Sequence, residues 1–306
     1  MVPLRRTARL GSVSVGDGFP VRIMAAVNVG PESFYKDSVA TTVRDISAHV
    51  LKATEGGADF IDIGAMSTAP YFKGEVSEEV ELTRIRAALR AIAEMGEGKP
   101  APSILSVDTL RASVADVALK DGASIINDVS GLHDPAMAKV VRDRGASLLA
   151  MAHSQNASEM RPIVRVRHAL RGTLRIAERA GIDERLIVLD PGIGFFREEG
   201  AGRAYSPQNL MPWHEWDCQI LANLGELKSL GRPVCVGLSR KSFLGKILNL
   251  ESPEERLSGS LAATAISVMN GANLIRTHDV KETAQAVRVA EAIMTNERGR
   301  RRVSVS

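Results

Sequence analysis

The feature that most constrains the fold of this chain is a repeated unit in which a helix-like stretch ends at a glycine and a short apolar run follows. Glycine suits a helix C-terminus because it adopts a left-handed backbone conformation at little cost. The apolar runs lack polar alternation, which is typical of parallel strands covered by helices on both faces. The repeated units and two further apolar runs lie at residues 22–29, 55–64, 103–109, 121–131, 144–153, 180–192, 230–240 and 270–279.

Eight strand candidates that alternate with helix-length segments predict βα units and a parallel sheet. Over 306 residues, this pattern favours an α/β fold of the (β/α)₈ TIM-barrel type, typically about 250 residues, over a doubly wound open sheet. Two of the intervening segments place apolar residues on one helical face. These residues are Val43, Ile46, Val50 and Ala53 in the first segment, and Ile85, Ala88, Leu89 and Ile92 in the second.

The two ends of the chain carry distinct patterns. The opening "RLGSVSVGDGFPV" (9–21) alternates around "GDG" and predicts a β-hairpin that closes the floor of the barrel. "DVKE" (279–282) is typical of a capping arrangement at the start of a last helix. No linker divides the chain, so we expect a single domain over 1–306, with a core at about 20–292 and a basic tail at 296–306.

Composition excludes several classes of protein. The chain has 44% hydrophobic and 25% charged residues and a net charge of +3, with basic and acidic residues interspersed, so no nucleic-acid surface is indicated. Its two cysteines, Cys218 and Cys235, predict free thiols in a reducing compartment. The N-terminus lacks the apolar stretch of a signal peptide, and no segment is long and apolar enough to span a membrane. We therefore expect a cytoplasmic protein without a membrane partner.

Polar residues follow the predicted strands, where a parallel barrel carries its active site. They are Asn28, Asp62, Ser67, Thr68, Asp108, Asn127, Asp128, His153, Asp190, Ser239, Arg240, Lys241, Arg276 and His278. Taken one at a time, several allow a structural interpretation: Asp190 before Pro-Gly suits a turn, Asp62 suits the barrel interior, and His153 suits an ordinary hydrogen-bonded histidine. Polar groups at all eight strand ends together indicate a shared pocket, because burying them without partners costs about 1–3 kcal/mol each.

The residue types indicate the ligand. Carboxylates and an asparagine near the barrel axis can hydrogen-bond a flat, nitrogen-rich heterocycle. The cations Arg240, Lys241, Arg276 and His278 follow neighbouring strands and could hold phosphate. Asn28 offers an oxygen that suits Mg²⁺ shared with phosphate oxygens. A pyrophosphate ester of a polar ring fits all three features.

The motifs at these strand ends resemble, in order, those of the dihydropteroate synthase family. They are "NVGPESF" (28–34), "IDIGAMSTAP" (61–70), "SVDT" (106–109), "IINDVSG" (125–131), "DPGIGF" (190–195), "SRKSF" (239–243) and "RTHDV" (276–280). The match extends over about residues 20–292. The resemblance implies a (β/α)₈ barrel, a homodimer, and condensation of 6-hydroxymethyl-7,8-dihydropterin pyrophosphate with p-aminobenzoate to dihydropteroate and pyrophosphate.

The resemblance also implies roles for single residues. Asp108, Asp190 and Lys241 would be catalytic, and together with Asn127 and Thr68 they would bind the pterin. Arg276 and His278 would hold the pyrophosphate, and Asn28 would do so together with Mg²⁺ as its metal ligand. Residues near p-aminobenzoate would be Thr68, Phe195, Ser239 and Arg240. Pyrophosphate would leave before the amine attacks, so no strong base is required.

The chain departs from the family pattern in the loops above the barrel. Gly30 and Glu32 replace the usual Thr and Asp, and Ala69 replaces an arginine. "MAHSQN" (151–156) and "GFFREEG" (194–200) also differ, and the segment through 217 is longer. Aromatic bulk at Tyr71, Phe72 and Phe196 could narrow the amine pocket, and the loops resemble sulfonamide-tolerant or archaeal forms. We therefore expect altered sulfonamide sensitivity.

Two other functions stay open at this point. A pterin-binding methyltransferase that uses methyltetrahydrofolate shares the barrel, although it needs neither "SRKSF" nor "RTH". A non-catalytic pterin-binding barrel would have lost turnover through Ala69 and the altered loops. The identity of the acceptor amine and the dimer contact are also open, with the outer helices near strands six to eight as candidates for that contact.

Overall fold

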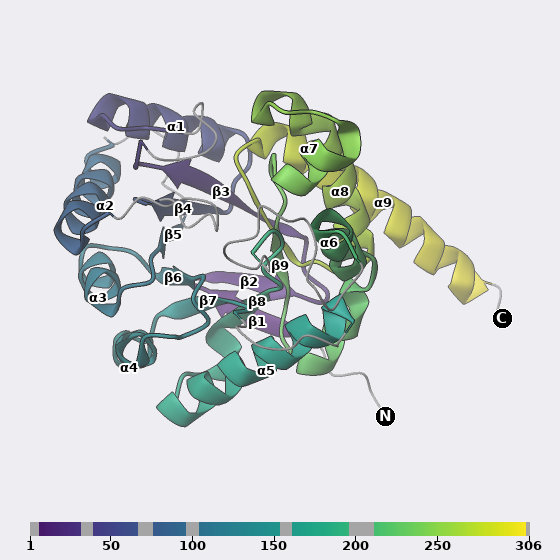
Figure 1. The fold of residues 1–306 in the computed structure, drawn as a ribbon, viewed down its shortest axis with the longest axis horizontal. Coiled ribbons are helices and arrows are strands. Elements are labelled where there is room, and N and C mark those ends of the chain that lie inside the picture. Colours follow the sequence, from purple (N-terminus) through teal and green to yellow (C-terminus); the bar gives the residue numbers. More distant parts are fainter. Residues whose placement is uncertain are drawn as a thin grey trace.

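The computed structural model describes residues 6–31, 39–66, 76–95, 104–153, 161–195 and 211–303, with side chains up to residue 296. Strands lie at the centre of the molecule and helices surround them (Figure 1). This arrangement is the (β/α)₈ barrel that the repeated unit predicts.

Eight parallel strands form the barrel in the order β8-β7-β6-β5-β4-β3-β10-β9. They are β3 (Arg22–Asn28), β4 (Phe60–Gly64), β5 (Ile104–Asp108), β6 (Ile125–Asp128), β7 (Ser147–Met151), β8 (Ile187–Asp190), β9 (Cys235–Gly237) and β10 (Leu274–Thr277). All eight lie within the predicted apolar runs. The ring closes between β8 and β9 through a bridge from Leu189 to Val234 and a bond from Leu189 N to Pro233 O of 3.0 Å.

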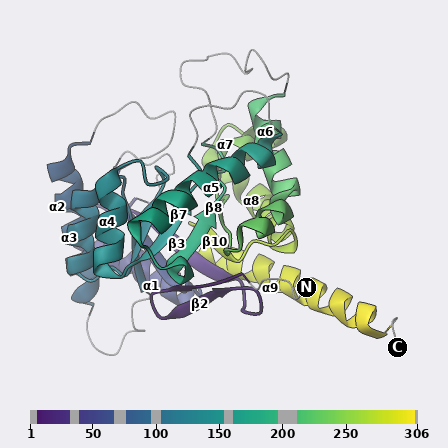
Figure 2. The same ribbon diagram turned by 90° about the horizontal axis from the view of Figure 1, so that it is seen from below.

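A hairpin of β1 (Thr7–Leu10) and β2 (Val13–Gly16) covers the amino end of the barrel (Figure 2). Leu10 and Val15 are fully buried and form one apolar cluster with residues from the amino-terminal halves of the barrel strands, among them Met24 and Phe60. The hairpin closes the floor as predicted, but its turn lies at Gly11–Ser12 and not at "GDG", which follows the second strand. Asp17 of "GDG" instead pairs with Arg6, with Arg6 Nη2 and Asp17 Oδ1 2.6 Å apart.

Helices and short 3₁₀ turns connect the strands on the outside of the barrel. They are α1 (Val43–Glu55), α2 (Glu78–Ala93), α3 (Ala112–Lys120), α4 (Pro135–Arg144), α5 (Pro162–Ala180), η2 (Glu184–Leu186), α6 (Trp213–Ala222), η3 (Leu224–Leu230), α7 (Ser242–Leu248), η4 (Pro253–Arg256), α8 (Leu257–Met269) and α9 (Val280–Val303). Glycines in left-handed conformation end α4 and α5, namely Gly145 and Gly181.

The predicted helical faces are buried against the barrel, with one exception. Ile46, Val50 and Ala53 of α1 and all four predicted residues of α2 are buried. Val43 is 56% exposed because it is the first residue of α1, before the helix reaches the sheet. The predicted last helix begins at Val280, but the carboxylate of Asp279 pairs with Arg240.

Other expectations concern the chain as a whole. Cys235 is buried, Cys218 is partly buried, and both are free thiols. Within the described segments, no helix is long and apolar enough to cross a bilayer.

Candidate active site

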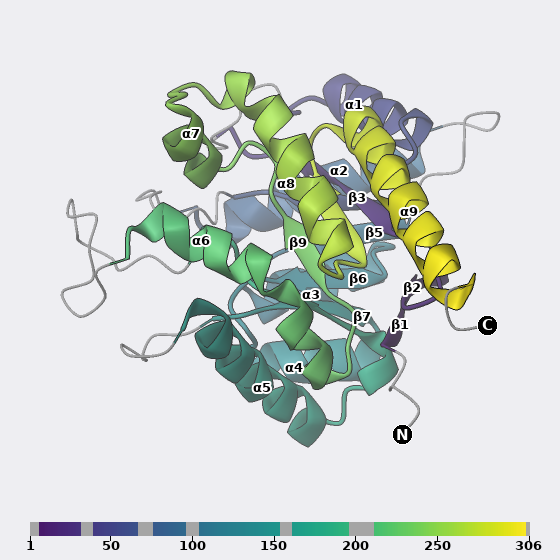
Figure 3. The same ribbon diagram turned by 90° about the vertical axis from the view of Figure 1, so that its right-hand side faces the viewer.

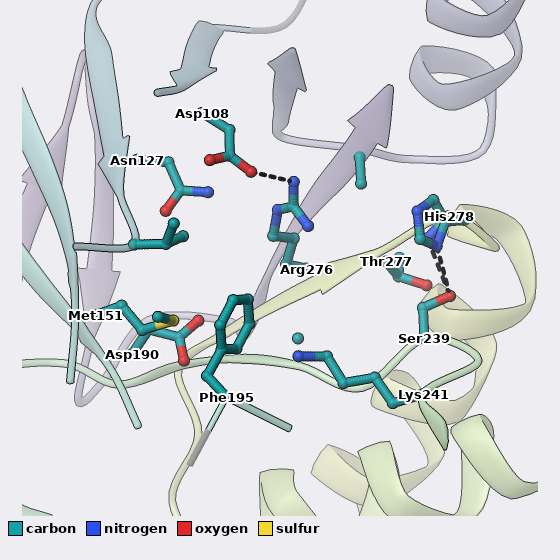
Figure 4. Close-up of a pocket in the computed structure, with 13 residues that line it drawn as sticks. Asp108, Asn127, Met151, Asp190, Phe195, Ser239, Lys241, Arg276, Thr277 and His278 are labelled. Carbon is teal, nitrogen blue, oxygen red and sulfur yellow. Dashed lines mark hydrogen bonds and ion pairs between the residues drawn. The ribbon is translucent and has the colours of Figure 1, made fainter. Parts of the chain in front are cut away.

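One pocket opens at the carboxyl ends of the strands, and all barrel strands except β4 contribute to it directly or through the loops that follow them (Figure 4). Its lining residues are Ala26, Asp108, Asn127, Val129, Met151, Asp190, Phe195, Gly237, Ser239, Lys241, Arg276, Thr277 and His278. The parallel strands bring these side chains together because their carboxyl ends meet at one face.

Asp62, in the middle of β4, organises the base of this pocket. It is fully buried and accepts hydrogen bonds from Ser106 Oγ at 2.6 Å, Asn127 Nδ2 at 2.9 Å and Arg276 Nε at 2.7 Å. Because a carboxylate only accepts, Asn127 must direct its amide nitrogen toward Asp62 and its oxygen elsewhere. The sequence left the role of Asp62 open; the structure makes it the residue that orients Asn127 and Arg276.

Asp108, the last residue of β5, faces Arg276 across the pocket (Figure 4). Arg276 Nη2 lies 3.2 Å from Asp108 Oδ2, whereas Oδ1 is buried and has no hydrogen-bond partner among the described residues. Burial raises the pKa of Asp108 to about 7, although the charge of Arg276 lowers it. Burial alone would lower the pKa of Arg276, but Asp62 and Asp108 raise it overall, so Arg276 stays charged. The unpartnered oxygen of Asp108 is therefore ready to accept a hydrogen bond from a ligand.

The loop after β8 brings together Asp190, Phe195 and Lys241. Asp190 Oδ1 accepts from Gly192 N at 2.7 Å, and burial raises the pKa of Asp190. Lys241 Nζ donates to Ile193 O and lies 4.7 Å from the centre of the Phe195 ring, a cation–π distance. Asp190 thus serves as a turn residue and lines the pocket as well.

The opposite rim holds His278 and Ser239, and Asn28 contacts His278 from behind. His278 Nδ1 lies 3.0 Å from Ser239 Oγ, and His278 Nε2 lies 3.3 Å from Asn28 Nδ2. Burial and the neighbouring charge of Arg276 lower the pKa of His278 to about 3. The sequence analysis grouped His278 with the cations, but an imidazole in this environment is neutral at neutral pH.

The chain is similar to known proteins over most of its length. Residues 24–278 match the pterin binding enzyme family. The dihydropteroate synthase of Clostridium beijerinckii is 34% identical over 288 residues, which cover 94% of this chain and 99% of that protein. The chain belongs to the dihydropteroate synthase family.

Two solved structures of family members superpose closely on this one. The synthase of Yersinia pestis, solved as a sulfonamide drug complex, has a TM-score of 0.80 and 30% identity, covering 95% of this chain and 99% of that one. The synthase of Xanthomonas albilineans, solved with 4-aminobenzoic acid, has a TM-score of 0.78 and 34% identity, covering 95% of this chain and 98% of that one. The family motifs therefore correspond to a shared fold over nearly the whole chain.

Most residues expected from the family motifs meet in the pocket. The expected residues that are found in its lining are Asp108, Asn127, Asp190, Phe195, Ser239, Lys241, Arg276 and His278. Asn28 lies behind His278, which it contacts, and is not part of the lining.

Arg240, which is expected near p-aminobenzoate, does not line the pocket. Its side chain is 7% exposed and pairs with Asp279, and it also donates to the backbone oxygens of Pro253 and Glu254 at 3.1 and 2.7 Å. Residue 240 adopts a left-handed φ of +56°, and its side chain is absent from the lining to which Ser239 and Lys241 contribute. The structure thus separates the middle residue of "SRK" from its two neighbours.

Several other candidates lie outside the described residues or outside the pocket. Those outside the described residues are Glu32, Ser67, Thr68, Ala69, Tyr71, Phe72, Phe196 and the second half of "MAHSQN", residues 154–156. His153 is exposed, 6.3 Å from His133 between ring centres, and does not belong to the lining. Asp128 is buried and accepts from Ser130 and from the backbone N–H of Leu132, so it holds the turn after β6.

Sequence reasoning missed Met151, Val129 and Thr277, which form apolar and hydroxyl walls of the pocket. It also missed Asp217 of α6, which is 3% exposed and accepts from Gly194 N at 2.9 Å. A helical aspartate 23 residues from its partner carries no local pattern, so only the fold reveals this contact.

Proposed function

We propose that this protein is a dihydropteroate synthase, a transferase of folate biosynthesis that condenses 6-hydroxymethyl-7,8-dihydropterin pyrophosphate with p-aminobenzoate to give dihydropteroate and pyrophosphate. The observation that carries the proposal is one pocket in which acceptor groups face cations: Asp108, Asn127 and Asp190 with Lys241 and Arg276. Membership of the family supports the same reaction.

In this proposal the pterin ring lies on the acceptor groups. A pterin carries N–H and amino donors along one edge and a carbonyl oxygen with ring nitrogens along another. Asp190 and the unpartnered Oδ1 of Asp108 suit the donors, and the ammonium of Lys241 suits a ring acceptor. Met151 offers an apolar contact to the flat face of the ring.

The charges of the pocket fit a reaction in which pyrophosphate leaves first. The C–O bond to the methylene carbon breaks, its electron pair leaves with pyrophosphate, and positive charge develops on the methylene group and the ring. Asp108 and Asp190 stabilise that cation, and Arg276 stabilises the leaving group. The lone pair of the aromatic amine then forms the C–N bond, and the nitrogen releases a proton. No activated nucleophile is needed on the protein.

We propose Mg²⁺ as the cofactor, held by the side-chain oxygen of Asn28. The amide nitrogen of Asn28 faces His278 Nε2, which leaves the oxygen as the atom that suits a hard cation. Among the described residues, no group of three or more His, Cys, Asp or Glu could hold a metal ion. This agrees with Mg²⁺, which commonly takes one or two protein ligands and completes its shell with water and substrate phosphates. When bound, it would neutralise charge on the pyrophosphate.

We further propose that p-aminobenzoate binds beside Phe195, Ser239 and Lys241, with Thr68 as a further expected contact. The cation–π pair of Lys241 and Phe195 supports an aromatic substrate at this edge, because the ring and the ammonium already lie together. The loop departures at Ala69 and Phe196 are the expected source of altered sulfonamide sensitivity. A sulfonamide inhibition constant equal to that of an ordinary family member would contradict that expectation.

A homodimer is the proposed assembly, through α7, α8 and α9, which lie on one side of the barrel (Figure 3). These helices expose large apolar side chains, as expected of an interface between subunits. The side chains are Ile247, Leu248, Ile266, Met269, Val289 and Ile293. The two free thiols support a reducing compartment and hence the cytoplasm. Light scattering of purified protein tests the dimer.

The decisive experiment measures pyrophosphate release by the purified protein with Mg²⁺ and the pterin pyrophosphate, with and without p-aminobenzoate. We expect release that depends on the amine, with dihydropteroate as product. Partner-dependent demethylation of methyltetrahydrofolate would indicate the methyltransferase instead. Pterin binding without turnover, for p-aminobenzoate and for other aromatic amines, would indicate a non-catalytic barrel.

A further inference from the structure

Asp279 is a partly buried carboxylate behind the pocket rim to which the reaction above assigns no role. It follows His278 directly and pairs with Arg240 in a two-pronged contact: Arg240 Nη2 lies 2.7 Å from Asp279 Oδ1, and Arg240 Nε lies 2.9 Å from Oδ2. A carboxylate held by a guanidinium only accepts hydrogen bonds. Whatever else contacts Asp279 must therefore donate to it.

Ser239 donates a hydrogen bond to the carboxylate of Asp279. Its hydroxyl lies 3.2 Å from Asp279 Oδ2 and donates its one proton there. The oxygen of Ser239 can then only accept from other neighbours. The backbone N–H of His278 donates to it at 3.3 Å, and His278 Nδ1 lies 3.0 Å from it. Nδ1 must consequently carry the ring proton, and Nε2 must be the unprotonated nitrogen.

The position of the ring proton of His278 also determines how the side-chain amide of Asn28 is oriented. His278 Nε2 lies 3.3 Å from Asn28 Nδ2, so the lone pair of Nε2 accepts from the amide nitrogen. That bond turns the side-chain oxygen of Asn28 away from the imidazole. One series of contacts thus runs from Arg240 through Asp279, Ser239 and His278 to Asn28, and it joins the ends of β9, β10 and β3.

We propose that Asp279 is a positioning residue that acts through Ser239 to hold His278 as the Nδ1–H tautomer, and thereby presents the side-chain oxygen of Asn28 as the ligand atom for the Mg²⁺ that would accompany the leaving pyrophosphate. The tautomer of a histidine is set by the hydrogen bond that its other nitrogen makes. Partners that orient a ligand in this way affect activity although they do not touch the substrate. The catalytic part of this inference rests on the proposed function, whereas the tautomer does not.

The first test is long-range ¹H–¹⁵N NMR of the histidine rings at pH 7, on protein without metal or substrate. His278→Asn identifies the His278 signals among the six histidines. We expect wild-type His278 to be protonated at Nδ1. In Asp279→Asn the amide nitrogen can face Ser239 and donate to it, so Ser239 donates to Nδ1 and the ring proton moves to Nε2. Glu282→Gln, which removes one negative charge three residues further along the chain, is the matched control and leaves the tautomer unchanged.

A second pair of variants covers the case in which Asp279→Asn does not fold, since it disturbs a buried ion pair. Ser239→Ala leaves the pair of Arg240 and Asp279 intact but removes the acceptor of Nδ1, so the preference for Nδ1–H is lost. Ser239→Thr keeps the hydroxyl and retains the tautomer. A wild-type ring protonated at Nε2, or a tautomer unaffected by both Asp279→Asn and Ser239→Ala, overturns the inference.

A kinetic experiment compares kcat/KM of the wild type and the variants for the pterin pyrophosphate in the presence of Mg²⁺. We expect Asp279→Asn to lower kcat/KM about 10–100-fold, the usual effect of losing a residue that orients a metal ligand without touching the metal. Glu282→Gln should stay within about twofold. A shifted tautomer with unchanged kcat/KM would overturn the positioning role. Absence of turnover in the wild type would count against the proposed function and leave the NMR result valid.

Discussion

The two ends of the same eight strands differ in chemistry. At the amino end, Leu10, Met24 and Phe60 are fully buried in an apolar cluster beneath the hairpin. Toward the carboxyl end, Asp62 in the middle of β4 and Asp108 at the end of β5 are 0% and 7% exposed and place carboxyl groups inside the barrel. The amino end stabilises the fold by removing apolar area from water, whereas the carboxyl end spends stability on groups that await a ligand.

The cost at the carboxyl end is visible in single atoms. Asp108 Oδ1 is buried without a partner among the described residues, an arrangement that costs about 1–3 kcal/mol. A fold selected for stability alone would place a satisfied or apolar side chain there. Stability and function are therefore separated along the strand axis, and variants at the two ends of the strands should differ accordingly.

Lys241→Met should give the largest effect on activity. It removes the cation that contacts Ile193 O and Phe195, and we expect kcat/KM to fall about 10²–10³-fold, as when one preorganised charge-stabilising donor is lost. The melting temperature should change little. Lys246→Met, an exposed lysine on α7, is the control and should keep full activity. Equal losses in both variants would contradict a role specific to the pocket.

Leu10→Ala should have the opposite profile. Leu10 is fully buried in the floor cluster, so its truncation should lower the free energy of unfolding by about 2–5 kcal/mol. The folded fraction should keep wild-type kcat/KM, because the floor lies at the other end of the strands. Phe19→Ala, at a side chain 42% exposed, should cost far less in a urea titration. A large loss of kcat/KM in folded Leu10→Ala would show that the two ends are coupled.

The titration of Asp108 should affect activity and stability in opposite directions. Its pKa is raised from 3.8 to about 7, so between these pH values the folded state holds a proton that the unfolded state has lost. Its contribution to stability therefore falls as pH rises through that window. Ionised Asp108 stabilises the proposed cation, so kcat/KM should fall about tenfold per pH unit below about 7.

Asp108→Asn separates these two effects. In urea titrations at pH 5 and pH 8, the variant should gain stability relative to the wild type at the higher pH, while its activity is low at both. Asp116→Asn is the control, because the bonds from Lys120 and Arg144 lower the pKa of that partly exposed carboxylate. A variant that loses stability more at pH 8 than at pH 5 would contradict the raised pKa.

Asp217→Ala should give the smallest effect. The carboxylate accepts from Gly194 N at 2.9 Å and so fixes the loop that presents Ile193 O and Phe195 to Lys241. Losing that bond should weaken pterin binding roughly tenfold, about the worth of one hydrogen bond to a charged acceptor. Asp217→Asn, which keeps an oxygen acceptor, should restore most of the affinity in calorimetry. If Asp217→Ala has the same effect in a Lys241→Met background, the loop does not act through Lys241.

The sequence was sufficient to predict the barrel and most of the pocket, and for a physical reason. Apolar runs that end in a polar residue mark both a strand and its carboxyl end, so Asp108, Asn127, Asp190 and Arg276 could be assigned to one face before any coordinates. The hairpin followed from alternation, although its turn was misplaced because Gly11 and "GDG" both offer turn residues.

What the sequence could not predict is the direction of side chains and the contacts made at long range. Arg240 lies between two pocket residues but pairs with Asp279 behind them, and no pattern in "SRK" indicates that contact. Asp279 has the sequence of a helix cap yet pairs with Arg240, 39 residues away. Asp62, in mid-strand, could be assigned only when its bonds to Asn127 and Arg276 were seen.

The junction of β8 and β9, which is the seam of the barrel, has a consequence for the exchange of backbone amide hydrogens with solvent. In the described part of the chain, β8 and β9 are joined by a single bridge, between Leu189 and Val234, whereas every other neighbouring pair of barrel strands forms a ladder. Opening this seam breaks the fewest backbone bonds, so the amide hydrogen of Leu189, which bonds to Pro233 O across the seam, should exchange with deuterium ahead of the amide hydrogens in the ladders. Asp190 and Gly237 lie at that seam, and a bound pterin that touches both would slow the exchange there.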